Sequence, residues 1–240
     1  MNKKLIKRYT TLGILFFLPV LFLLMLFPSK HNYTPLSVVH SGVVEFQNFT
    51  SDDNKEIVLE DYITVLGFLG RNPMDNVMAA SNLKELVYNK FKGFKNFQVV
   101  LLLPYGAEKD IEILKKEIKS YEDLKYWHFL YGEDADIERV FNSLKSKETL
   151  DNDLATHEVF IIDKDLNQRG RLDDRTDKEK EKNKPAYPLY SYNCIEVSEM
   201  KNKMSADDLR VLFQEYRDRR KGNFDSSTRR ANSLKSSNHE

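Results

Sequence analysis

The sequence predicts an α/β fold: a sandwich of helices around a mixed β-sheet, attached to a single N-terminal membrane segment. Apolar runs of strand length alternate with amphipathic runs of helical spacing along most of the chain, a pattern typical of α/β domains. Near residue 165, two strand-like runs follow each other across a short polar turn, which adds antiparallel pairing to the sheet. Residues 12–27 carry no charged or amide side chain, which predicts the membrane segment.

The apolar stretch at the front of the chain is long enough to cross a membrane. Together with residues 9–11 it approaches the roughly 20 residues that span the hydrocarbon core. Basic residues precede it, namely Lys3, Lys4, Lys7 and Arg8. Only Lys30 follows closely on the other side, so the charge bias keeps the N-terminus in the cytoplasm and exports the rest. No small-x-small cleavage site and no cysteine that could accept a lipid follow, so we expect a retained signal anchor.

The composition fits one exported domain on that anchor. About 200 residues outside the membrane suffice for a single domain with its own core. The last residues are rich in Ser, Asn and Arg and nearly lack apolar side chains, which is typical of disorder. We expect a cytoplasmic N-terminus at 1–8, a transmembrane anchor at 9–27, a linker at 28–42, a periplasmic domain at 43–221 and a disordered tail at 222–240.

Charge and cysteine content restrict the partners. The chain has 37 basic and 37 acidic residues, so no overall field draws it to nucleic acid or anionic lipid, and we expect no nucleic-acid partner. Cys194 is the only cysteine, which excludes an intramolecular disulfide in an exported and oxidising compartment. We expect it to be a small buried hydrophobe; a bond to a partner or a role as a soft metal ligand remain alternatives.

The first half of the domain contains three predicted strands. Residues 43–49 and 56–59 flank the polar residues 52–55, which predicts an N-terminal hairpin. Residues 62–69 are β-branched and aromatic, as in a buried strand. A helix follows this strand, because apolar side chains recur at helical spacing at Val77, Ala80, Leu83, Leu86, Val87 and Phe91.

The second half continues the alternation. Residues 97–103 are almost entirely apolar, which places that strand inside the sheet. Further strands are predicted at 126–131, 157–163 and 168–172, and helices at 110–121 and 134–144. Residues 173–184 alternate in charge without apolar periodicity, which predicts a solvated loop. Ser205 is the expected cap of a last helix that ends before Gly222.

The turn at residues 70–77 is the candidate functional site. It joins strand 62–69 to the following helix, where side chains are exposed beside a helix N-terminus that stabilises anions and thiolates. Thioredoxin-like proteins carry their reactive cysteines at such a turn. Here Asn72 and Asn76 supply neither a thiolate nor a redox couple, so we expect no thiol oxidoreductase or peroxidase activity.

From about residue 43 to 220, the order of elements and several motifs resemble the SCO/SenC family. Its members carry Cys-Pro-x-x-Cys-Pro after a buried strand, and here Asn72-Pro-Met-Asp-Asn76-Val stands in that place. His157, just before an apolar strand that ends in Asp163, resembles the distant histidine of the family. The strand that starts at Trp127 resembles the family's Trp-x-Phe-Leu-x-Gly, whereas Leu103 stands where the family has the carboxylate of an Asp-Pro element.

The resemblance implies a thioredoxin-like domain and a relation to copper. SCO/SenC proteins are membrane-anchored copper chaperones that help to assemble the copper centre of cytochrome c oxidase. Cu(I) prefers soft sulfur ligands, and an amide supplies only a hard oxygen. Met74 and Met78 lie four residues apart on one face of the expected helix, so Met74, Met78 and His157 form a possible Cu(I) site if the family geometry holds. The alternatives are that Met78 packs in the core, Met74 covers the turn and His157 is hydrogen-bonded near the sheet end.

Two functions follow from these observations. The first is a non-catalytic SCO-like protein, anchored in the membrane, that binds a protein partner during oxidase assembly or copper handling and needs no cofactor. The second is a copper chaperone with a Cu(I) site rebuilt from Met74, Met78 and His157. The amount of copper bound by the purified protein distinguishes them.

Overall fold

The computed structural model describes residues 3–26, 33–52, 55–118 and 124–222, in two compact units divided after Thr34. The first unit contains helix α1 (Lys3–Leu26), with Pro19 inside it. Its stretch Ile6–Met25 is long and apolar enough to cross a membrane, and none of it is buried. Length and composition therefore make α1 a candidate membrane anchor.

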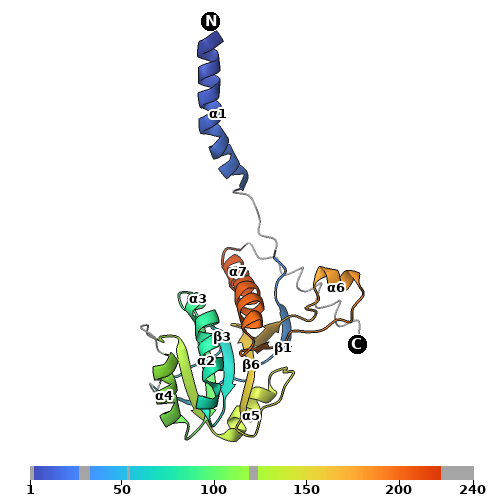
Figure 1. The fold of residues 1–240 in the computed structure, drawn as a ribbon. Helices are drawn as coiled ribbons and strands as arrows, with labels where there is room; N and C mark the ends of the chain where they lie inside the picture. Colours follow the sequence, from blue (N-terminus) through green and yellow to red (C-terminus); the bar gives the residue numbers. More distant parts are fainter. Residues whose placement is uncertain (1–2, 27–32, 53–54, 119–123, 223–240) are drawn as a thin grey trace. The chain divides into compact units, whose positions relative to one another are not determined.

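The second unit is built on one mixed β-sheet (Figure 1). Its strands are β1 (Ser37–Ser41), β2 (Thr50–Ser51), β3 (Ile63–Leu69), β4 (Phe97–Pro104), β5 (Trp127–Gly132), β6 (Ala155–Ile162), β7 (Asn167–Gly170) and β8 (Tyr192–Asn193). The sheet order is β1-β7-β6-β3-β4-β5-β2, and β8 pairs with β6. Strands β3, β4 and β5 are parallel, whereas β6 is antiparallel to β3 and β7 is antiparallel to β6. A parallel pair joined through a helix and extended by an antiparallel hairpin is a thioredoxin-like arrangement.

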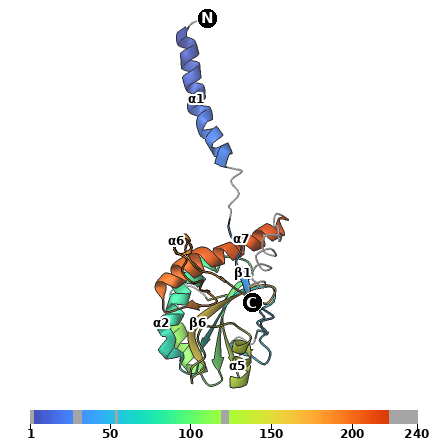
Figure 2. The same cartoon turned by 90° about the vertical axis from the view of Figure 1, so that its right-hand side faces the viewer.

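Helices cover both faces of the sheet (Figure 2). After a 3₁₀ turn at η1 (Pro73–Asn76), a continuous helical segment contains α2 (Val77–Leu83), the π-helical η2 (Lys84–Tyr88) and α3 (Asn89–Phe91). The others are α4 (Glu108–Ile118), α5 (Asp134–Asn142), α6 (Asp177–Glu181) and the π-helical η3 (Glu199–Asp208), which continues as α7 (Leu209–Arg220).

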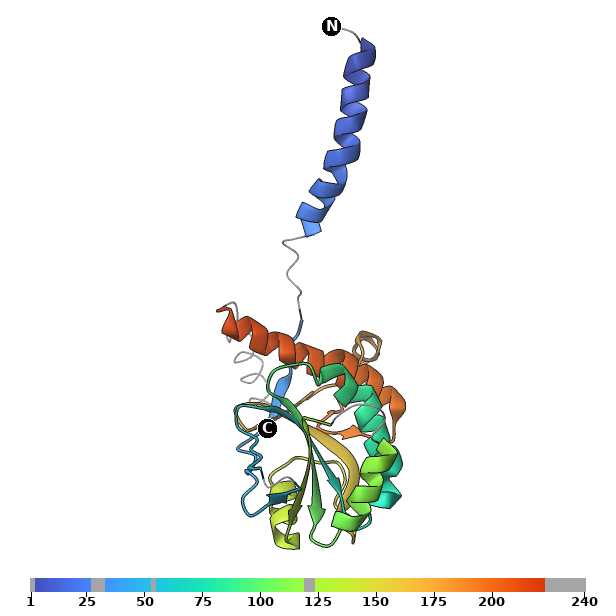
Figure 3. The same cartoon turned by 90° about the vertical axis from the view of Figure 1, so that its left-hand side faces the viewer.

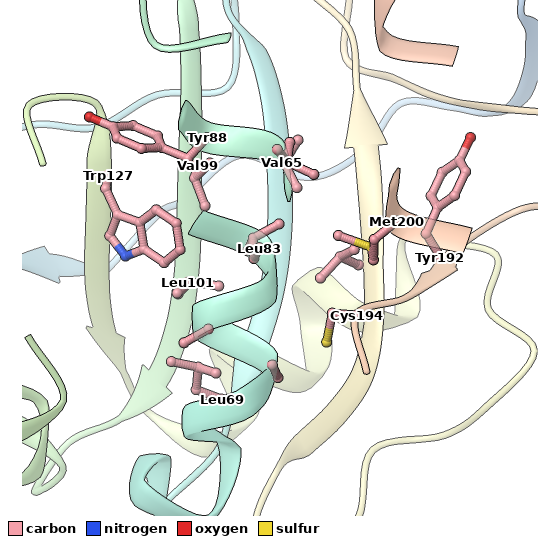
Figure 4. Packing of buried hydrophobic residues seen from close by; sticks show 14 of the residues in the cluster. Val65, Leu69, Leu83, Tyr88, Val99, Leu101, Trp127, Tyr192, Cys194 and Met200 are labelled. Carbon is pink, nitrogen blue, oxygen red and sulfur yellow. The ribbon is translucent and has the colours of Figure 1, made fainter. Parts of the chain in front are cut away.

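The alternation of side chains along the central strands divides the core in two. In β3, Val65 and Leu69 face one cluster, which also contains side chains from α2, α4 and α7. Leu66 and Phe68 point to the other face, where Ile137 of α5 belongs to the second cluster. Figure 4 shows α2 packed over β3 and β4, with Cys194 and Met200 beside β6. Because β3 and β4 are buried along their whole length, each reads as a nearly continuous apolar run, interrupted by Thr64 in β3 and Gln98 in β4.

Most of the predicted elements are confirmed. The predicted α/β sandwich around a mixed sheet is present, and the strands and helices expected between residues 62 and 172 are found with their ends shifted by a few residues. The predicted helix at 110–121 is α4, although its last residues lie outside the described part of the chain. The tail predicted to be disordered also lies outside it, apart from Gly222.

The predicted N-terminal hairpin is wrong. Neither 43–49 nor 56–59 is a strand, and the two strands that open the domain lie at opposite edges of the sheet, β1 beside β7 and β2 beside β5. The carboxylate of Glu45 accepts hydrogen bonds from the backbone N–H of Leu59, at 2.9 and 3.0 Å, and of Glu60, at 2.7 Å. A side chain therefore joins the two segments where a strand ladder was expected.

Three further expectations are corrected at the element boundaries. Strand β1 lies inside 28–42, the stretch predicted to be a linker. The stretch 173–184, predicted to be a loop, contains α6, because Thr176 and Glu179 form a capping box in which the Glu179 carboxylate accepts the Thr176 N–H at 2.9 Å. Ser205 does not cap the last helix; it lies buried inside η3, where its hydroxyl accepts a hydrogen bond from the Lys90 ammonium at 3.0 Å.

Candidate functional site

The turn after β3 is held by a loop from a distant part of the chain. Gly70 has a φ of +73°, and a Cβ at this position would lie 2.6 Å from the carbonyl oxygen of Asp153 and 2.7 Å from the Ala155 Cβ. The N–H of Arg71 donates to that same carbonyl at 2.9 Å. The guanidinium of Arg71 forms an ion pair with Asp134 at the start of α5. Glycine is therefore required by both the backbone conformation and the close approach of the loop.

The two asparagines that the resemblance places at the cysteine positions of the SCO/SenC motif use their amides to fix the turn. Asn76 is buried, and its side-chain N–H donates to the carbonyl oxygen of Leu69 at 3.0 Å. Asn72 is exposed, and its side-chain N–H donates to the carboxylate of Asp153 at 3.0 Å. A thiol is a weaker hydrogen-bond donor than an amide. The asparagines therefore perform a structural task at this turn, and their oxygens are hard ligands that suit a soft Cu(I) ion poorly.

Both methionines of the turn are accessible to solvent. Met74 in η1 has a relative exposure of 37%, and Met78 in α2 has one of 63%. The alternative that Met78 packs in the core is therefore wrong. A thioether in contact with water is available to a ligand or to a partner surface.

His157 lies on β6, next to the residue that pairs with β3. Its neighbour Thr156 is opposite Phe68, so His157 is close in register to the end of β3. The side chain of His157 is exposed. Within the described residues, no hydrogen bond joins it to Met74 or Met78, and no group of three His, Cys, Asp or Glu side chains is placed to hold a metal ion. The Met74, Met78 and His157 site stays a prediction.

Cys194 is buried behind the site, as expected of a small hydrophobe. Its thiol donates to the backbone carbonyl of His157 at 2.8 Å, and its own N–H donates to the same oxygen at 2.8 Å. Burial raises the pKa of the Cys194 thiol to about 12. The thiolate, which is the reactive form, is therefore strongly disfavoured near neutral pH.

Sequence reasoning missed Asp153, which holds the turn through both its backbone and its side chain. The loop around it is ordered by Asp151, whose carboxylate accepts the N–H of Asp153 at 2.9 Å and of Ala155 at 2.8 Å. An Asp carboxylate that accepts the N–H two residues later forms an Asx turn, and Asp favours such turns, so the sequence does indicate a structured loop there. The contact between Asp153 and the turn some 80 residues earlier in the chain leaves no pattern in the nearby sequence.

No model of a known protein family matches the sequence, and no curated protein matches it. Solved structures do. The soluble domain of Sco1 from Bacillus subtilis is 16% identical, with 75% of this chain and 92% of that chain covered and a TM-score of 0.41. ScoI from Bradyrhizobium japonicum with copper bound is 15% identical, with 68% and 99% covered and a TM-score of 0.34. The thioredoxin domain of a thiol-disulfide oxidoreductase from Bacteroides vulgatus is 14% identical, with 56% and 86% covered and a TM-score of 0.38.

The order and direction of the strands, rather than these scores, establish the fold of this chain. The solved structures that it resembles include members of the Sco family and thioredoxin-like oxidoreductases.

Proposed function

We propose that this chain is a membrane-anchored, non-catalytic thioredoxin-like protein whose exported domain binds a protein partner in copper handling or cytochrome c oxidase assembly. The observation that carries the proposal is the pair of hydrogen bonds made by the Asn72 and Asn76 side chains. At the turn where a thioredoxin-like protein holds its reactive sulfurs, both side chains are engaged in hydrogen bonds within the protein. These hydrogen bonds hold the turn, and neither side chain supplies a thiol.

The remaining cysteine does not replace the missing pair. Thiol–disulfide exchange needs an accessible thiolate. The thiol of Cys194 is instead buried and hydrogen-bonded, and its pKa is raised. The surface of the turn instead offers the flexible side chains of Met74 and Met78 beside the Arg71–Asp134 ion pair. Exposed methionines adapt their shape to a bound surface, which suits recognition of a protein partner.

The absence of redox chemistry is tested with the full chain in detergent. Insulin reduction and peroxide consumption are the assays, and we expect no turnover above that of a Cys194→Ser variant. Turnover that depends on Cys194 would contradict the proposal.

Partner binding is tested by photo-crosslinking in intact membranes. A photoreactive amino acid at Met78 reports on the turn, and the same amino acid at Val58, which is also exposed, is the matched control. We expect a discrete adduct from position 78 that is absent from position 58. Identical adducts at both positions, or none at position 78, would contradict partner binding through the turn.

A second function is favoured by the exposure of the two thioethers, which leaves them free to hold a soft ion. In this alternative, Cu(I) is the cargo, bound by Met74 and Met78 together with His157. Competition against a calibrated Cu(I) chelator tests it. Tight binding that is lost on Met74→Leu or Met78→Leu would favour this copper carrier over the first proposal.

The double change Asn72→Cys with Asn76→Cys provides the positive control for the copper measurement. It places two sulfurs one helical turn apart, and stoichiometric Cu(I) binding is expected if the turn has the family geometry. Failure of this variant to bind would count against the residue-by-residue match to the SCO/SenC motif.

A further inference from the structure

A basic pocket lies at the end of the sheet opposite the turn. Ile63, the first residue of β3, is in its wall, whereas the turn follows the last residue of that strand, about 20 Å away for a strand of this length. The pocket has a volume of about 650 Å³, which is in the range of small-molecule sites. It is formed by the connection between α3 and β4, the turn after β6 and the last turns of α7. Figure 3 shows α7 passing across this end of the sheet.

Five cations line the basic pocket: Lys95, Lys164, Arg217, Arg219 and Arg220. Arg219 is compensated by Glu215, at 2.8 Å, and by Asp165, at 3.3 Å. The other four make no ion pair with any residue that the structure describes. The chain as a whole is neutral, so this concentration of positive charge does not reflect a general excess.

The cations are close enough to affect one another. The pKa of Lys164 is lowered, first by partial burial; the carboxylates of Asp61 and Asp165 oppose this effect, whereas the positive charges of Lys95 and Arg220 add to it. The arginines in the last turn of α7 need no ligand to account for them, because the helix dipole favours cations at a helix C-terminus. Lys95 and Lys164 come from other elements, and their addition to the arginines is repulsive. A bound anion relieves this repulsion among the cations.

Aromatic rings lie among these charges. The ring centroids of Phe94 and Phe213 are 4.4 Å apart, and Phe94 is 38% exposed. The Tyr216 ring lies 5.6 Å from the Lys164 ammonium and 5.0 Å from the Arg219 guanidinium carbon. The pocket therefore presents apolar surface directly beside cations.

We propose that the basic pocket binds a phosphate-bearing compound, with the phosphate on Arg217, Arg220, Lys95 and Lys164 and an apolar part against Phe94. Guanidinium groups match the oxygens of a phosphate in pairs, and lysines add point charge. Several cations that make no ion pair suit a group with two or more negative charges better than a single carboxylate. A free phosphate compound and a lipid headgroup share this chemistry.

Calorimetric titration of the full chain in neutral detergent tests the proposal. The probes are inorganic pyrophosphate and dioctanoyl phosphatidic acid, and we expect one saturable site. Arg217→Gln with Arg220→Gln removes two charged contacts and weakens binding by about tenfold or more. Lys178→Gln with Lys182→Gln, both exposed and away from the pocket, removes the same charge and leaves the dissociation constant unchanged.

Two further variants keep the result interpretable. Arg217→Lys with Arg220→Lys retains the charge at the same helix end, and its binding is expected between those of the wild type and the glutamine variant. Phe94→Ala reports on the apolar part. If Phe94→Ala weakens the binding of phosphatidic acid but not of pyrophosphate, the natural ligand is a lipid headgroup. If the two probes bind equally well and Phe94→Ala changes the binding of neither, the natural ligand is a free phosphate compound. Lack of saturable binding of both probes, or equal losses in the two glutamine variants, would overturn the proposal.

Discussion

At the scale of single residues, two amides determine what the turn can do. The sequence alone shows that Asn72 and Asn76 supply no thiolate, because this follows from residue type. It does not show that Asn76 donates to Leu69 or that Asn72 reaches Asp153, because the second partner is distant in the chain. Residue chemistry was predictable here, and the hydrogen bonds that give the residues a structural role were not.

The two asparagines differ in burial, so their removal should differ in cost. Asn76→Ala leaves the buried Leu69 carbonyl without its donor and should lower the free energy of unfolding by about 1–3 kcal/mol. Asn72→Ala should cost less than about 0.5 kcal/mol, since water can replace an exposed contact. Urea unfolding of the full chain in detergent, followed by circular dichroism, measures both. Equal losses would contradict the structural role assigned to Asn76.

Glu158 gives stability a dependence on pH. It is 5% exposed on β6, and burial raises its pKa above the ordinary value of 4.5. A carboxyl with a raised pKa in the folded state contributes stability below pH 4.5 and loses it as the pH rises through the folded value. Glu158→Gln should therefore become more stable than the wild type as the pH increases from 4 to 8. Urea midpoints across this range measure the difference, and a difference that does not change with pH would contradict the assignment.

At the scale of elements, buried strands were easier to predict than connections. β3 and β4 read as nearly continuous apolar runs because both of their faces are covered. The hairpin at 43–49 and 56–59 was wrong because Val43, Phe46 and Leu59 pack in the core while Glu45, a single side chain, joins the segments. The last helix begins earlier than Ser205 because the buried Met200 and Met204 pack its first turns against the core, a tertiary effect.

The turn after β3 should tolerate substitution less well than another turn of the same backbone conformation. Gly70 and Gly42 both have a positive φ, +73° and +78°, but a Cβ on Gly42 would meet no atom within 4 Å. Gly42→Ala should therefore cost only the backbone strain, about 1–2 kcal/mol. Gly70→Ala should cost more, since its Cβ would collide with Asp153 and Ala155. Urea unfolding compares the two variants, and equal costs would show that the loop at Asp153 moves away freely.

At the scale of the whole molecule, the sequence predicted an α/β domain with a separate apolar helix, and the structure has both. Periodicity and composition are sufficient for this, because each depends on nearby residues. The basic pocket was not predicted: its cations come from three separate segments of the chain, and only the fold brings them together. The candidate site was predicted as a turn, but the loop that holds it was not.

The prediction of a retained anchor can be tested on the mature protein. If 9–27 is retained, the chain recovered from membranes should begin before Tyr9 and resist extraction by alkaline carbonate, because about 20 apolar residues hold it in the bilayer. Mass spectrometry of the intact protein measures where it begins. The matched control is Phe27→Ala with Ser29→Ala, which creates the small-x-small pattern that the sequence lacks and should allow cleavage there. A wild-type chain that begins near Lys30 would show that the apolar helix is a signal peptide, and the exported domain would then reach its partner without an anchor.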